Sequence, residues 1–158
     1  MIRRESEYRL LAYDAEDLAA RRHPRVVATP WLGVKVRPTA RIARYAVLVE
    51  PPGYTGFTPQ WLAAPKTLRV LAGSNVTVLA CGAPPGDLAE GRLELPSGPE
   101  QALERLYEKD GLLFYRGAFL AERSGLLRVN LQPLDLQRAG AQAVVALSMV
   151  ADLPPAAD

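Results

Sequence analysis

The chain has 158 residues, of which 49% are hydrophobic, so it is long enough for one domain with a substantial core. Its formal net charge is only +2, and basic residues are interspersed with acidic ones, so no nucleic-acid partner is expected. No apolar run approaches the roughly 20 residues that cross a bilayer, and the single cysteine, Cys81, excludes an intrachain disulfide.

Residues 1–42 are predicted to form an N-terminal segment made of a strand and a linker. Apolar and other residues alternate over residues 8–13, which predicts a strand. Residues 14–22 begin with Asp14 and contain helix-forming residues, which allows one or two helical turns. Short strands are expected at residues 25–28 and 33–37.

The main part of the chain, residues 43–150, has the pattern of short strands joined by turns. The sequence contains 14 Pro and 12 Gly, as such turns require. Residues 82–87 include two prolines, which cannot donate ladder hydrogen bonds, so a surface connection is predicted there. Strands are expected at residues 43–50, 68–71, 76–81, 92–95, 101–109, 112–119, 126–131 and 143–150.

One of these strands has an ambiguous pattern. Leu103 and Leu106 are spaced as on a helix, yet residues 101–109 also alternate as in a strand. The following Asp110-Gly111 pair favours a two-residue hairpin. We therefore expect residues 101–109 to pair with residues 112–119.

The expected fold is all-β: an immunoglobulin-like β-sandwich with an extended N-terminal segment. Its strands have sandwich-like spacing, and no long amphipathic helix interrupts them. The Cys…Trp…Cys pattern of antibody domains is missing, so an antibody-type domain is not predicted. Residues 43–150 form the sandwich, and residues 151–158 are a Pro-rich C-terminal linker.

The sequence offers no catalytic constellation, so we expect no enzyme. His23 is the only histidine and lies between Arg22 and Pro24, which suggests an exposed corner rather than a catalytic base. Cys81 lies in an apolar strand and is expected to be a small buried residue. One histidine and one cysteine are too few for a zinc site, and the glycines match no phosphate-binding loop. No metal, cofactor or catalytic residue is therefore predicted.

Aromatic side chains give the best candidates for a contact site. Tyr54, Phe57 and Trp61 cluster beside a Pro-rich corner, and Trp31 precedes them. They could form an apolar surface for a protein partner. The interpretation we favour from the sequence is that Tyr54 and Trp61 close one end of the sandwich, because aromatic residues are common in cores.

Several motifs resemble the periplasmic module of large bacterial membrane proteins of unknown function. These motifs are the corner Pro51-Pro52-Gly53-Tyr54-Thr55-Gly56, the strand Ala72-Gly73-Ser74-Asn75-Val76 and the end Asp152-Leu153-Pro154-Pro155. The resemblance covers residues 43–155, although Gly53 stands where alanine is usual. It implies a non-catalytic periplasmic module whose partners are proteins, with a membrane reached only through a parent chain. It also makes the N-terminal segment resemble the end of a preceding module.

Three functions are therefore considered. The first is a non-catalytic, extracytoplasmic Ig-like module that spaces domains or contacts other proteins. The second is a viral structural protein, such as a capsid-decorating or tail protein located in the virion. The third is a carbohydrate-binding module, in which Trp31, Tyr54, Phe57 and Trp61 would stack on sugar rings.

Overall fold

A computed structural model describes residues 5–8, 10–13, 26–35, 39–96 and 98–151 of the chain. The chain divides into two compact units, Met1–Pro38 and Thr39–Asp158. The predicted boundaries after residues 42 and 150 stay predictions. The predicted helical turns at residues 14–22 lie outside the described residues.

Among its described residues, the first unit has two short antiparallel strand pairs. Strand β1 (Glu5–Tyr8) pairs with β4 (Leu32–Lys35), and β2 (Leu11–Tyr13) pairs with β3 (Val26–Ala28). The strand predicted over residues 8–13 is therefore two strands. Between them, the main-chain N–H of Leu10 donates to the Thr29 hydroxyl and that of Thr29 donates to the Leu10 carbonyl, both at 3.0 Å.

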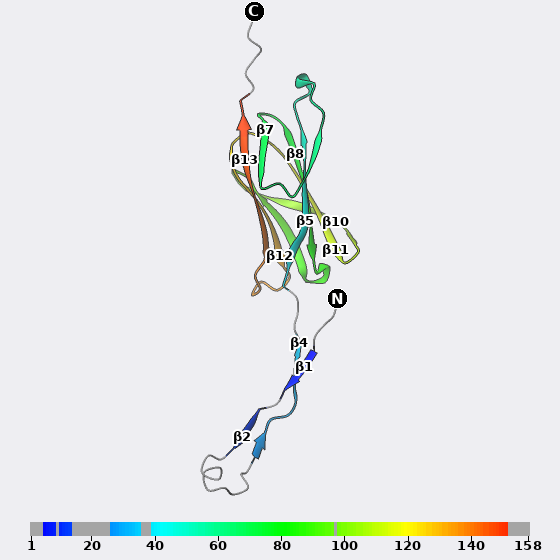
Figure 1. The fold of residues 1–158 in the computed structure, drawn as a ribbon, viewed down its shortest axis with the longest axis vertical. Coiled ribbons are helices and arrows are strands. Elements are labelled where there is room, and N and C mark those ends of the chain that lie inside the picture. The colour runs from blue at the N-terminus through cyan, green and yellow to red at the C-terminus, as the bar shows by residue number, and fades with distance from the viewer. Residues whose placement is uncertain (1–4, 9, 14–25, 36–38, 97, 152–158) are drawn as a thin grey trace, which may run out of the picture. The chain divides into compact units, whose positions relative to one another are not determined.

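The described residues of the second unit, 39–96 and 98–151, form nine strands and two short 3-10 helices (Figure 1). In chain order these are β5 (Arg41–Glu50), η1 (Gly53–Thr55), β6 (Gln60–Ala63), β7 (Thr67–Leu71), β8 (Asn75–Ala83), η2 (Pro85–Asp87), β9 (Leu88–Glu94), β10 (Glu100–Lys109), β11 (Leu112–Leu120), β12 (Gly125–Pro133) and β13 (Ala141–Val150).

All nine strands belong to one curled sheet with the order β6-β5-β8-β11-β10-β9-β12-β13-β7. Neighbours are antiparallel except β13 and β7, which are parallel. The two edge strands are consecutive in the chain, because Ala64, Pro65 and Lys66 carry it from β6 at one edge to β7 at the other. The structure thus confirms an all-β fold, while the immunoglobulin-like form of a sandwich stays a prediction.

Strand β10 pairs with a different neighbouring strand in each part of its length. Its first residues, up to Leu103, pair with β9, and its residues from Glu104 onward pair with β11. We call β6, β5, β8 and β11 the first half of the sheet, and β9, β12, β13 and β7 the second half. Leu103 lies where glycines face it on both sides: a Cβ added at Gly91 would lie 2.9 Å from its Cδ1, and one at Gly117 would lie 2.4 Å from its Cδ2. The absence of side chains at these two glycines lets the strands approach closely here.

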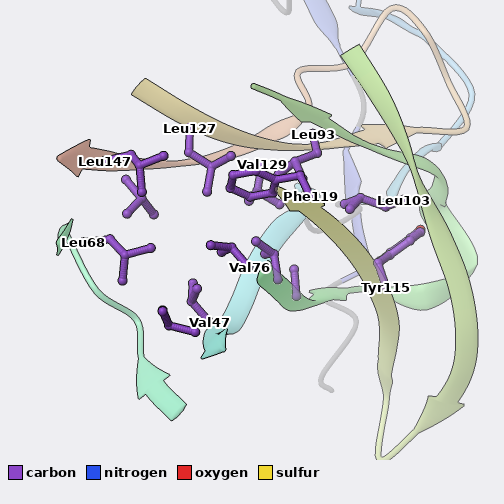
Figure 2. Packing of buried hydrophobic residues seen from close by; sticks show 14 of the residues in the cluster. Val47, Leu68, Val76, Leu93, Leu103, Tyr115, Phe119, Leu127, Val129 and Leu147 are labelled. Atoms are coloured by element: carbon purple, nitrogen blue, oxygen red, sulfur yellow. The ribbon is translucent and has the colours of Figure 1, made fainter. Parts of the chain in front are cut away.

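The core is one cluster of buried aliphatic side chains contributed by both halves. Figure 2 shows Val47 and Val76 of the first half sharing an interior with Leu68 and Leu127 of the second. Alternate residues of these strands are buried, as expected for a sheet with one face on the core. Tyr115, only 1% exposed, adds an aromatic ring and donates its hydroxyl hydrogen to the Ala89 carbonyl at 3.2 Å.

The hairpin prediction is confirmed, whereas part of a predicted loop is wrong. Lys109 pairs with Leu112 across Asp110-Gly111, and both turn residues have positive φ, 53° and 73°. Gly82, predicted in a surface connection, is instead a buried residue of β8 that pairs with Leu113. Because Gly82 lacks a Cβ, the side chains of Leu88 on β9 and Leu131 on β12, across the core, pack directly against it.

Candidate functional site

The corner after β5 is held by its own local hydrogen bonds. Pro51 and Pro52 end the strand, since neither has an N–H for the ladder. The Thr55 hydroxyl donates to the Pro52 carbonyl at 2.7 Å and accepts from the Phe57 N–H at 3.3 Å. Gly56 then takes a left-handed conformation, with φ 67°, that suits glycine.

This corner extends past the sheet, as the β5–β6 hairpin in Figure 1 shows. The last residue of β5, Glu50, pairs with Asn75, which is the first residue of β8. Residues 51–59 therefore lie beyond the end of the neighbouring strand. Residues 51–65 also contain no Asp, Glu, Lys, Arg or His. We call residues 51–65 the uncharged hairpin.

The aromatic residues of the uncharged hairpin are exposed. Tyr54 is 73% exposed, Phe57 67% and Trp61 59%. The prediction that Tyr54 and Trp61 close one end of the core is therefore wrong. The physical reasons differ: Tyr54 follows Glu50, past the first residue of the neighbouring strand β8, whereas Trp61 lies on the edge strand β6, opposite Leu48 on the outer face of the sheet.

Trp61 borders a hollow on the outer face of the first half. Val47 and Val49 of β5 point into the core, so Leu48 between them points outward, opposite Trp61 on β6 and Thr77 on β8. The hollow has a volume of about 640 Å³. Its lining residues are Leu48, Trp61, Thr77, Leu79, Gln101, Ala102, Glu104, Leu106, Arg116, Gly117 and Ala118.

The far side of this hollow is polar. Arg116 donates to the Glu104 carboxylate at 2.7 Å, and the Gln101 amide donates to the Ala118 carbonyl at 3.0 Å. The hollow thus combines an indole ring and aliphatic walls with one balanced ion pair. Sequence reasoning missed Leu48 and Leu79, although each stands between two core residues and so had to lie on the opposite face of its strand.

Phe57 contributes to a different, smaller pocket of about 260 Å³ between the hairpin and β7. Arg69 and the buried Ser74 also line this pocket. Within the described part of the chain, the Ser74 hydroxyl has no hydrogen-bond partner. The uncharged hairpin therefore presents Trp61 and Phe57 to two different pockets. Trp31 belongs to the first unit, where it is 61% exposed.

Of the two residues considered for catalysis, the structure describes Cys81. Cys81 is 4% exposed and its thiol donates to the Arg44 carbonyl at 3.5 Å, which confirms the predicted buried cysteine. His23 lies outside the described residues. In the described ranges, no three His, Cys, Asp or Glu side chains are grouped so that they could hold a metal ion. The same ranges contain no helix long and apolar enough to cross a membrane.

Glu94, on β9 of the second half, is a carboxylate that two side chains of β12 hydrogen-bond. Glu94 accepts hydrogen bonds from Arg128 at 2.9 Å and Asn130 at 2.8 Å. The Arg128 hydrogen bond is the main reason why the pKa of Glu94 is lowered. These two hydrogen bonds link β9 to β12 through side chains as well as through the ladder.

The chain was compared with protein-family models and with curated proteins, and it matches neither a family model nor a curated protein.

Proposed function

We propose that this chain is a non-catalytic, immunoglobulin-like interaction module that acts outside the cytoplasm and contacts other proteins through the uncharged hairpin. The observation that carries the proposal is the joint exposure of Tyr54, Phe57 and Trp61 on one projecting hairpin. Exposed aromatic residues of this kind are the usual anchors of protein interfaces.

The distribution of charged residues also supports the uncharged hairpin as the contact surface. Charged residues make up 23% of the chain, yet residues 51–65 contain none. Interface centres are depleted of charge and enriched in aromatic residues. The extracytoplasmic location rests on the resemblance of the corner and its neighbouring strand to bacterial periplasmic modules.

Site-specific photo-crosslinking tests this proposal. A benzophenone amino acid in place of Tyr54 should give cross-linked protein adducts in the native cell. The matched control carries the same group in place of Leu136, which is 85% exposed between β12 and β13 and should give no adducts. Equal labelling at both positions, or none at Tyr54, would contradict the contact role of the hairpin.

The hollow beside Trp61 favours carbohydrate binding as a second candidate. An exposed indole next to Gln101, Glu104 and Arg116 offers a stacking surface together with hydrogen-bonding groups. A glycan titration followed by tryptophan fluorescence would test this candidate, with Trp61→Phe assigning the signal to the hollow. No change with any sugar would remove it.

A further inference from the structure

Strand β6 is an edge of the sheet, and its hydrogen bonds to β5 show which of its main-chain groups remain unused. The N–H of Ala64 donates to the Tyr45 carbonyl at 2.9 Å. In an antiparallel pair such hydrogen-bonded positions alternate, so Leu62 opposite Val47 is also a bonded position. The N–H and C=O groups of Trp61 and Ala63 therefore point away from β5, and in the described sheet no strand lies beyond β6.

The charges around the two sheet edges differ. Natural sheets protect edge strands in several ways, of which charged residues, lysine above all, are one and short strands and prolines are others. The β7 edge follows this rule, because it carries Arg69 and is preceded by Lys66. Strand β6 has no charge, and neither has the chain on either side of it within the uncharged hairpin. An exposed edge without charge is suited to pairing with another strand.

We propose that β6 pairs antiparallel with β6 of a second copy of this chain. The inference rests on the proposed contact function and names the partner of the uncharged hairpin. Such a pair is isologous, so the same groups meet on both sides of a two-fold axis. Because β6 carries no charge, two copies can pair through it without like-charge repulsion. Two β7 edges would repel each other, because each carries Arg69.

The flanking prolines select one register. Trp61 and Ala63 present the unused groups, and Pro59 and Pro65, two residues further out on each side, have no N–H. The Pro65 carbonyl already accepts the Tyr45 hydroxyl at 2.9 Å. Only the register centred on Leu62 places Trp61 of each copy opposite Ala63 of the other. Every unused N–H and C=O of these two residues is then paired.

The side chains fit this register. Trp61 and Ala63 are two residues apart in β6 and lie on the same, outer face of the sheet. Each indole would therefore face a small residue of the other copy, Ala63, beside which Ala46 lies on β5. Because Ala63 and Ala46 are small, the Trp61 indole has room to lie flat across the boundary between the two copies. Shifting the register to centre on Trp61 would instead set the two indoles against each other and a proline against each Ala63.

The first test is the association state of the purified chain, measured by sedimentation equilibrium over a wide concentration range. The wild-type chain should form a dimer. Trp61→Lys should weaken dimerisation by about thirtyfold or more, as expected for loss of an aromatic anchor at an interface centre. Thr67→Lys adds the same charge at the exposed β7 edge and should leave the dimer unchanged.

The second test reads the register by disulfide trapping. Leu62→Cys places two sulfurs at directly opposite positions, where Cβ atoms are about 4.5–5.5 Å apart, so mild oxidation should link the copies. Ala63→Cys is the matched control. In this register residue 63 of one copy lies diagonally from residue 63 of the other, at about 7–8 Å, so the two new cysteines should cross-link poorly. Cys81 is buried and should not take part.

The following results would overturn the inference: a wild-type chain that stays monomeric at every concentration, a dimer that Trp61→Lys does not weaken, or efficient trapping through Ala63→Cys but not Leu62→Cys. Disruption by Thr67→Lys would mean that β6 pairs with β7 instead. A monomeric wild type whose Tyr54 position still cross-links to a different protein would reject the second copy while leaving the contact function intact.

Discussion

The close packing around Leu103 makes Gly117→Ala the most informative single substitution in the sheet. Gly117 lies in β11 directly under the Leu103 side chain, at the point where β10 changes partners. The new methyl group would lie 2.4 Å from Leu103 Cδ2 and 3.5 Å from Leu93 Cδ2. Carbon atoms pack best at about 3.5–4.0 Å, so only the Leu103 contact is a clash.

Leu103 has little space into which it can retreat. It is 7% exposed, and its other methyl group is close to Gly91 on the opposite side. Overpacking of a buried site costs about 1–3 kcal/mol. We therefore expect Gly117→Ala to lower the free energy of unfolding by an amount in this range.

Urea unfolding followed by far-ultraviolet circular dichroism measures this change. The midpoint should fall while the slope of the transition stays constant, because the surface exposed on unfolding is nearly the same. Gly53→Ala is the matched control: a Cβ there would have no neighbour within 4 Å, and its φ is not positive. That variant should stay within about 0.5 kcal/mol of wild type.

A double-mutant cycle identifies the cause. Leu103→Ala removes both methyl groups and should itself cost about 2–5 kcal/mol. In that background Gly117→Ala should cost far less than in the wild type, giving a coupling free energy of about 0.5–3 kcal/mol. The reasoning is refuted if Gly117→Ala is as neutral as Gly53→Ala, or if its cost is unchanged when Leu103 is alanine.

Three other predictions concern titrating and buried groups. Tyr115→Phe should cost about 1 kcal/mol near neutral pH through the lost hydrogen bond to Ala89. Burial raises the pKa of Tyr115 in the folded chain, so the wild type loses stability as pH rises from the unfolded pKa through the folded one. The difference in urea midpoint between the wild type and Tyr115→Phe should therefore shrink over this pH range. A constant difference would contradict this reasoning. Arg128 lowers the pKa of Glu94, so the stability from this carboxylate is present above about pH 4.5 and is lost as pH falls through the folded pKa; Glu94→Gln should flatten acid unfolding curves. Cys81 should react with a thiol reagent only as fast as the chain opens, and rapid labelling of the native chain would show that the thiol is accessible.

Local signals in the sequence predicted the β10–β11 turn and most of β8. The Asp110-Gly111 pair predicts its hairpin because both residues tolerate positive φ, and the structure has that turn at that place. The alternation in residues 76–81 likewise identifies most of β8, and Cys81 is buried as predicted.

What the sequence could not supply depends on residues far apart in the chain. The exposure of Tyr54 follows from where β8 begins, at Asn75 opposite Glu50, and no property of the corner itself encodes that endpoint. Strand β6 was missed because its few residues lie between prolines and pair only with β5. The division of β10 between two partners is likewise decided by long-range packing around Leu103.

The direction of the strands gives the second unit a mechanical property. Six successive antiparallel pairings connect β5 to β13, so these two strands run the same way. The chain therefore enters at one end of the sheet, at Arg41, and leaves at the other, at Val150 (Figure 1). A pull on these two points acts along the strands, across ladder hydrogen bonds that lie roughly perpendicular or slanted to them. The ladders of β5 with β8 and of β13 with β7 are then loaded in shear, and their bonds share the force instead of opening one after another. A unit with this geometry is suited to bear tension when it is linked in series with others.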